Sequence, residues 1–212
     1  DWDEVILFCQ PGGLEANSKN YSSYESKPEQ RNPTLFVAHW DVTLSAPACY
    51  RILENRGISV HFSIGNRGEI YQYLDLRDVA WHAGSRSHNH ASIGVEISCA
   101  YDLKWNSWYE RKGFGERPIV RDAQVHGKTL SPFLGFYPVQ IQALVALVKA
   151  IHDGCGIPLK TPNVKNGLDP DVVDGSFSGF CSHYHITERK IDCAGLNLEH
   201  IIQSAITLSK ES

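Results

Sequence analysis

Residues 34–39 read Thr-Leu-Phe-Val-Ala-His, an apolar run that ends at a histidine. Such a short, continuous apolar run is typical of a strand buried on both faces, as in the centre of a parallel or mixed sheet. Sites are commonly built where such strands end. The run therefore predicts a central strand whose last residue, His39, can take part in a site.

The segments around this strand show both helical and extended patterns. Residues 138–152 have apolar residues at helical spacing, with Pro138 at the start and Gly154 soon after the end, which predicts a long helix. Residues 60–73 predict a hairpin around residues 66–68, because Asn and Gly tolerate turn conformations. Further expected elements are helices over 47–56 and 196–208 and a loop over 11–33. Together they predict an α/β fold in one domain, with a central mixed β-sheet flanked by helices.

Composition and charge exclude several classes of protein. The chain has 212 residues, 42% hydrophobic and 21% charged, which suits one domain with a sizeable core. Its net charge of −4 argues against a nucleic-acid partner, which would need a basic excess or a basic stripe. No apolar stretch is long enough for a membrane span, and no signal peptide is visible at the start. We expect a monomer with mostly free thiols among its six cysteines.

A second histidine, His183, opens a segment with the ligands and charges of a catalytic metal site. A catalytic zinc is usually held by three protein ligands and keeps a fourth position for water, whereas structural sites often use cysteine pairs, which this chain lacks. If residues 190–192 are extended, Lys190 and Asp192 point to the same side of the chain. His39, His183 and Asp192 are therefore candidate zinc ligands, with a cation beside them.

Most of the ten histidines need no metal to explain them. A lone histidine is more often a surface residue or a hydrogen-bonded core residue than a ligand. In an extended chain His185 would share a face with His183, so its role stays open. The histidines that we interpret as ordinary surface or core residues are His88, His90, His126, His152 and His200.

Glu96 lies in a stretch with the alternation of a strand, Ile93-Gly-Val-Glu-Ile-Ser98. Three apolar residues fall on one face, and Glu96 falls on the other with Gly94 and Ser98. On burial habits alone, Glu96 is an ordinary solvated strand residue. A partly desolvated carboxylate near a cation would also suit a general base.

Several motifs occur together in an order that resembles a known family. They are Leu35-Phe-Val-Ala-His-Trp-Asp, Val60-His-Phe-Ser-Ile-Gly-Asn-Arg-Gly-Glu-Ile-Tyr-Gln-Tyr, Ala80-Trp-His-Ala-Gly, Asn89-His-Ala-Ser-Ile-Gly-Val-Glu-Ile, and the segment from His183 to Gly195. Their order resembles that of the type 2 N-acetylmuramoyl-L-alanine amidases, a zinc family that includes phage lysins, bacterial cell-wall amidases and peptidoglycan recognition proteins. The resemblance covers roughly residues 33 to 205.

The resemblance implies a role for each of these residues. It makes His39, His183 and Asp192 the zinc ligands, Glu96 the catalytic carboxylate and Lys190 the cation that stabilises the oxyanion. It also implies a substrate groove, whose candidate residues are Trp81, His82 and His61. In domain terms, we expect an N-terminal extension over residues 1–33 and a zinc amidase domain over 34–212.

The chain departs from the family pattern at two positions. The family usually has Pro after its third ligand, whereas Cys193 follows Asp192 here, so Cys193 is an alternative third ligand. The Lys-x-ligand spacing favours Asp192. Some phage members also have Tyr where this chain has Val60, so a mechanism that uses that Tyr is not available, and Glu96 indicates the subgroup with a glutamate.

The amidase domain is expected to contain an insertion at about residues 100–137, longer than the connection that the family often has. It is rich in aromatic and basic residues, which can stack on sugars and meet peptide carboxylates. Long insertions also fold over and cover a small core, so both interpretations stay open.

The expected activity is zinc-dependent hydrolysis of the amide between the lactyl group of N-acetylmuramic acid and L-alanine in peptidoglycan. Two alternatives remain: a non-catalytic peptidoglycan-recognition module and a cytosolic recycling amidase for anhydro-muropeptides. The protein is expected to act on the cell wall, as a secreted or periplasmic enzyme or as a bacteriolytic phage endolysin made in the host cytoplasm.

Overall fold

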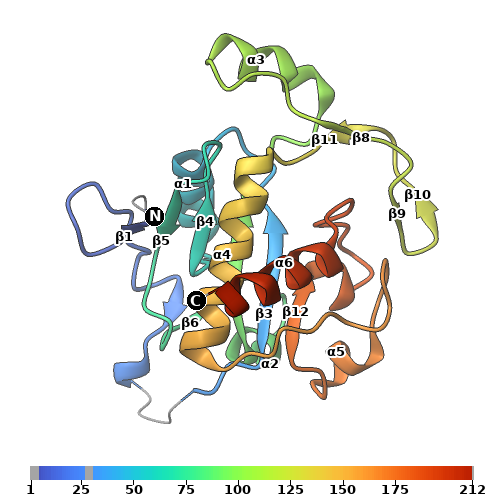
Figure 1. The fold of residues 1–212 in the computed structure, drawn as a ribbon. Helices are drawn as coiled ribbons and strands as arrows, with labels where there is room; N and C mark the ends of the chain where they lie inside the picture. Colours follow the sequence, from blue (N-terminus) through green and yellow to red (C-terminus); the bar gives the residue numbers. More distant parts are fainter. Residues whose placement is uncertain (1–4, 27–30, 212) are drawn as a thin grey trace.

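The computed structural model describes residues 5–26 and 31–211, and its centre is a six-stranded mixed sheet (Figure 1). The strand order is β1-β5-β4-β7-β3-β12. The strands are β1 (Val5–Leu7), β3 (Leu35–Trp40), β4 (Phe62–Ile64), β5 (Ile70–Gln72), β7 (Ser92–Ile97) and β12 (Gly179–Ser182). Only the β4–β5 pair is antiparallel. The predicted α/β class, central mixed sheet and single domain are confirmed.

The predicted central strand and hairpin are both present. All six residues of β3 are buried, and it pairs in parallel with β7 on one side and β12 on the other. The hairpin joins β4 to β5, with Ile64 opposite Ile70, and Gly68 in its turn has φ 84°. That conformation favours glycine, because a Cβ would be strained there.

Helices flank the sheet, and the two longest, α4 and α6, cover one of its faces. The elements are α1 (Ala46–Arg56), α2 (Arg86–Ala91), α3 (Asn106–Arg111), α4 (Pro138–Cys155), α5 (Pro170–Asp174) and α6 (Leu198–Glu211), with 3₁₀ turns at Tyr24–Ser26, Leu103–Trp105 and His183–His185. In Figure 1, α4 and α6 lie across the near face of the sheet. The main core lies between them and that face, where Phe36, Ala38 and Trp40 of β3 point. No helix among the described residues has both the length and the apolar character to cross a membrane.

Element ends differ from the predictions in ways that have local causes. The helix predicted over 138–152 continues to Cys155 because Gly154 stays helical and Gly156, with φ 72°, is the C-cap. The loop predicted over 11–33 is wrong in part. It contains β2 (Tyr21–Ser22), which pairs with β6 (Val79–Ala80), and the first 3₁₀ turn. A two-residue strand is too short to give an alternating pattern. Residues 27–30 of this prediction lie outside the described residues.

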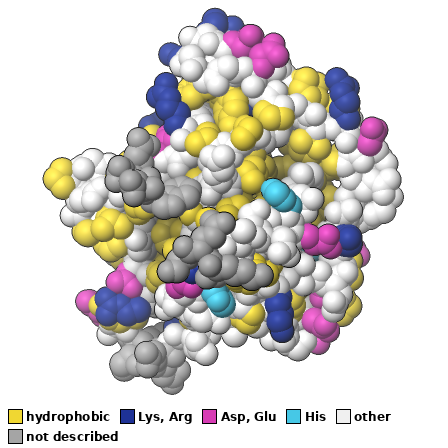
Figure 2. All heavy atoms as spheres, viewed as in Figure 1, with side chains coloured by type: hydrophobic (Ala, Val, Ile, Leu, Met, Phe, Trp, Pro, Cys, Tyr) yellow, Lys and Arg dark blue, Asp and Glu magenta, His cyan; other side chains and the backbone are white. Residues whose placement is uncertain are grey.

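The segment over residues 100–137 forms an arm that extends from the body (Figure 1). It contains α3 and two small antiparallel pairs, β8 (Ile119–Val120) with β11 (Phe133–Leu134) and β9 (Gln124–Val125) with β10 (Lys128–Thr129). Figure 2 shows apolar side chains gathered where this arm meets the body on the face of α4. The arm is joined to the body partly by the buried Arg117, whose guanidinium donates hydrogen bonds to the side chains of Asn66 and Gln140. The same guanidinium lies over the rings of Tyr109 and Tyr137.

Candidate active site

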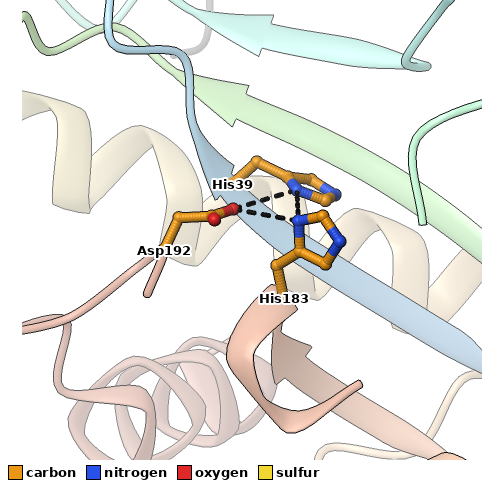
Figure 3. A group of neighbouring side chains, drawn as sticks. All are labelled: His39, His183 and Asp192. Carbon is orange, nitrogen blue, oxygen red and sulfur yellow. Dashed lines mark hydrogen bonds and ion pairs between the residues drawn. The ribbon is translucent and has the colours of Figure 1, made fainter. Parts of the chain in front are cut away.

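Three buried side chains converge at the ends of two neighbouring strands (Figure 3). Nδ1 of His39 lies 3.0 Å from Nδ1 of His183, and each lies 3.2 Å from Oδ2 of Asp192. His39 is in β3, and His183 directly follows β12, which pairs with β3 through Ser182 and Ala38. The parallel pairing therefore brings together two histidines that are 144 residues apart in sequence.

Asp192 reaches the two histidines from a turn-rich segment that returns to β12. Its backbone oxygen accepts a hydrogen bond of 3.1 Å from the backbone nitrogen of Tyr184, the residue after His183. Residues 190 and 191 belong to no helix, strand or turn and Asp192 begins a turn, so the strand considered for residues 190–192 does not form. Asp192 is nevertheless in the cluster, while the fully buried side chain of Cys193 packs in the main core.

Hydrogen bonds among Ser92, His82 and His39 determine which ring nitrogen of His39 carries its hydrogen. Oγ of Ser92 donates its hydrogen to the backbone oxygen of His88 at 2.6 Å, so it accepts from Nε2 of His82 at 3.1 Å. Burial, and then the neighbouring His39, lower the pKa of His82 well below its ordinary value, so His82 is neutral. Its Nδ1 therefore accepts a hydrogen bond of 2.9 Å from Nε2 of His39. The Nδ1 lone pair of His39 is left facing Asp192 and His183.

This arrangement fits a zinc ion. Two imidazole nitrogens and a carboxylate oxygen are ligands that zinc prefers. Metal–ligand bonds of about 2.0–2.2 Å at tetrahedral angles separate ligand atoms by roughly 3.3 Å, close to the 3.0–3.2 Å observed. Lone pairs that face one another this closely repel unless a cation lies between them. The three residues can therefore hold a metal and leave a fourth position open.

The charges of His39 and Asp192 match this role. Burial, and then the neighbouring His183, lower the pKa of His39 to about 4, so its ring is neutral near pH 7. Burial alone would raise the pKa of Asp192, but its contacts with His183 and His39 outweigh burial and lower it, so Asp192 is a carboxylate. These are the ionisation states that metal ligands require.

Glu96 lies beside this cluster on the next strand. It is opposite His39 in the β3–β7 pairing, so both side chains leave the same face of the sheet, from strands about 4.8 Å apart. Its Oε2 is buried and has no hydrogen-bond partner among the described residues. Burial, followed by the charges of Asp41 and Asp192, raises the pKa of Glu96 well above its ordinary value. A carboxyl group in this environment is suited to taking up a proton.

Lys190 is exposed in the loop just before Asp192. Its positive charge is near enough to act on the cluster, because it favours the ionised form of Glu96 and disfavours protonation of His39. These effects are smaller than those of burial. The backbone oxygen of Lys190 accepts a hydrogen bond of 2.9 Å from Nε2 of His126.

Of the three candidate groove residues, Trp81 lines a cavity, whereas His82 and His61 do not. Trp81 is half-buried and borders a cavity of about 610 Å³ that is also lined by Arg31, Arg77 and Arg86. His82 packs on Gly94, where an added Cβ would lie 2.6 Å from its ring. His61 is fully buried and bonds to the backbone nitrogen of Gly94. Its side chain therefore offers no surface to a ligand, although it lies beside His82.

Comparison with known proteins identifies the family. A model of the N-acetylmuramoyl-L-alanine amidase (Amidase_2) family matches residues 29–194, most of the chain. The chain belongs to this family. The chain is also similar to a curated protein of Rickettsia conorii, RC0497, which is described as an N-acetylmuramoyl-L-alanine amidase and is 34% identical over 85 residues. The match spans 40% of this chain and about a third of that relative, 32%.

Several solved structures share the fold at low sequence identity. Staphylococcus aureus hydrolase AmiA matches with a TM-score of 0.58 at 9% identity, over 99% of this chain and 86% of its own. The amidase AmiD of E. coli matches with a TM-score of 0.54 at 19% identity, over 88% and 66%. The endolysin LysCS of Clostridium intestinale matches with a TM-score of 0.51 at 15% identity, over 97% and 96%. AmiD was solved with anhydro-N-acetylmuramic acid-L-Ala-D-γ-Glu-L-Lys.

Other histidines of this amidase-family chain lie outside the cluster. His185, whose role the sequence left open, is buried and its ring bonds to the backbone of Ser182 and Val164. His88 and His152 also bond to backbone oxygens. The contact of His82 with His39 was not anticipated, since no sequence pattern links two residues 43 positions apart.

Proposed function

We propose that this protein is a zinc-dependent N-acetylmuramoyl-L-alanine amidase that hydrolyses the amide between the lactyl group and L-alanine of peptidoglycan. The observation that carries the proposal is the convergence of three lone pairs, from His39, His183 and Asp192, beside Glu96 on the adjacent strand. Family membership supports the reaction, and the AmiD complex supports a muropeptide as the class of substrate.

The proposed metal ligands are His39, His183 and Asp192. A zinc ion held there would supply a Lewis acid and a water molecule of lowered pKa. The hydrogen bond from His39 to His82 keeps the ligand nitrogen of His39 free of hydrogen. We therefore assign His82 to the support of the metal site as well as to the wall of the groove.

Glu96 is the proposed general base and acid. Its buried, unpartnered oxygen can accept the proton of the attacking water as the water oxygen bonds to the lactyl carbonyl carbon. The same proton is then delivered to the alanine nitrogen as the carbon–nitrogen bond breaks. Its raised pKa favours this cycle, because the protonated form is stable enough to wait for the leaving amine.

Lys190 and Trp81 are proposed to act on the substrate directly. A positive charge at Lys190 would stabilise the negative charge that develops on the carbonyl oxygen during attack. Trp81, at the edge of the cavity, offers an apolar ring surface on which a sugar can stack. His61, whose ring meets that of His82 edge-on with centroids 6.1 Å apart, is proposed to support His82.

Two experiments separate this proposal from its alternatives. A recognition module would bind muropeptides without hydrolysing them, so turnover of a soluble muropeptide by the zinc-loaded protein supports an enzyme. A recycling amidase would cleave soluble anhydro-muropeptides and leave intact sacculi untouched, whereas a cell-wall amidase or lysin would degrade both. Cleavage of intact sacculi supports action on the cell wall, by a secreted enzyme or by a lysin.

A further inference from the structure

The hairpin formed by β9 and β10, at the end of the arm, contacts the loop that carries Lys190. In Figure 1 it descends from the arm toward the loops that precede and follow β12. At its tip, Nε2 of His126 donates a hydrogen bond of 2.9 Å to the backbone oxygen of Lys190. The sequence alone explains this insertion as a cover or a substrate loop. In the structure it also contacts the loop that carries Lys190.

The Lys190 loop has little structure of its own. The backbone nitrogen of Lys190 makes one long bond, 3.3 Å, to the oxygen of Thr187. Residues 188–190 are all exposed, and no regular helix or strand includes them. Among the hydrogen bonds of the described residues, the one from His126 joins the Lys190 backbone to a distant part of the fold.

The hairpin itself is firmly held. Val125 is 1% exposed and belongs to the main core, so the hairpin is anchored next to His126. The backbone nitrogen of His126 donates to the oxygen of Asn166 at 2.8 Å, and its ring meets the edge of Tyr184 with centroids 6.4 Å apart. Tyr184 in turn bonds to the backbone of Asp192. These contacts hold His126 in a fixed position relative to the core.

We propose that His126 is a positioning residue that fixes the backbone of Lys190 so that its ammonium group meets the developing oxyanion. The inference rests on the proposed catalytic role of Lys190. A lysine side chain has a long, flexible stem, so on an unsupported, exposed loop its ammonium group would occupy many positions. Displacement of a reacting group by about 1 Å can lower turnover by roughly a hundredfold, so support of the backbone matters.

The test uses the full-length, zinc-loaded protein and a soluble N-acetylmuramoyl peptide. His126 has φ 53°, which Asn tolerates, so His126→Asn should keep the hairpin while its short amide cannot reach Lys190. We expect kcat to fall by about tenfold, with KM and zinc content unchanged. His126→Gln restores a donor of similar reach and should recover most of the loss. Lys128→Ala, an exposed change in the same hairpin, is the control and should keep normal kcat.

A double-mutant cycle with Lys190→Ala separates positioning from a general structural role. His126→Asn should cause no further loss of kcat when Lys190 is already Ala. Normal kcat in His126→Asn, or the same loss with and without Lys190, would overturn the inference while leaving the amidase function in place. Normal kcat in Lys190→Ala would instead overturn the catalytic role of Lys190, and the inference with it.

Discussion

Replacement of His82 tests whether its hydrogen bond with His39 strengthens zinc binding at the cluster. In His82→Phe the ring keeps its bulk, but Nε2 of His39 loses its acceptor at 2.9 Å. The lost hydrogen bond leaves a buried donor unpaired, which costs about 1–3 kcal/mol, and the His39 ring can then carry its hydrogen on the ligand nitrogen. Both effects weaken zinc binding, and loss of such a partner typically costs 10–100-fold in affinity, or about 1.4–2.8 kcal/mol.

A second variant reaches the same contact from another residue. An added Cβ at Gly94 would lie 2.6 Å from the ring of His82, so Gly94→Ala should displace the ring and weaken zinc binding as well. His88→Ala is the matched control, because His88 is a nearby histidine that bonds to Ser85 and to the backbone of Val172.

The assay is competition between apo-protein and a chromogenic zinc chelator at pH 7.5, with circular dichroism to check folding. We expect His82→Phe and Gly94→Ala to bind zinc at least tenfold more weakly than the parent, and His88→Ala to bind like the parent. If both variants fold and bind zinc within twofold of the parent, His82 does not prepare His39, and the reasoning from tautomers is refuted.

Three further predictions concern the ligands, the base and a buried histidine. Asp192→Ala should lose stoichiometric zinc, whereas Cys193→Ala should keep it and lose only about 1 kcal/mol of stability, because the Cys193 side chain is in the core. Metal analysis and thermal unfolding distinguish the two variants. The reverse pattern would make Cys193 the ligand. Glu96→Gln should keep zinc and lower kcat at least about a hundredfold, so near-normal turnover would exclude a base at this position. Burial, and then Arg31, lower the pKa of His61 to about 3, so the folded state resists a proton that the unfolded state binds below pH 6.5. In apo-protein, wild type should therefore lose stability relative to His61→Asn by about 1.4 kcal/mol per pH unit as pH falls below 6.5, and a difference that stays constant between pH 7.5 and 5.5 would contradict this.

The parts of the fold that sequence predicts well are those with local signals. The strand at residues 34–39 is a continuous apolar run, and the hairpin around Gly68 has a turn that needs a positive φ. By contrast, β1 and β2 are two or three residues long and depend on partners elsewhere in the chain. Their pairing is a tertiary effect that leaves no periodic pattern in sequence.

In the site, too, sequence patterns identify some residues, whereas other contacts depend on the tertiary structure. Residue types, together with the resemblance to the amidase family, identified His39, His183 and Asp192 as candidate ligands, although residues 190–192 do not form the strand that the spacing argument assumed. The bonds of His82 with His39 and of His126 with Lys190 join residues 43 and 64 positions apart. Those contacts depend on how loops pack on the sheet, so only the folded structure reveals them.

Product analysis of digested peptidoglycan tests the proposed amidase activity most directly. Purified sacculi treated with the zinc-loaded protein should release free peptides with a new N-terminal alanine, detected by mass spectrometry, and should show no new reducing sugar ends. A chelator should stop the release and added zinc should restore it. New reducing ends, or new amines on residues deeper in the stem peptide, would contradict the proposed bond.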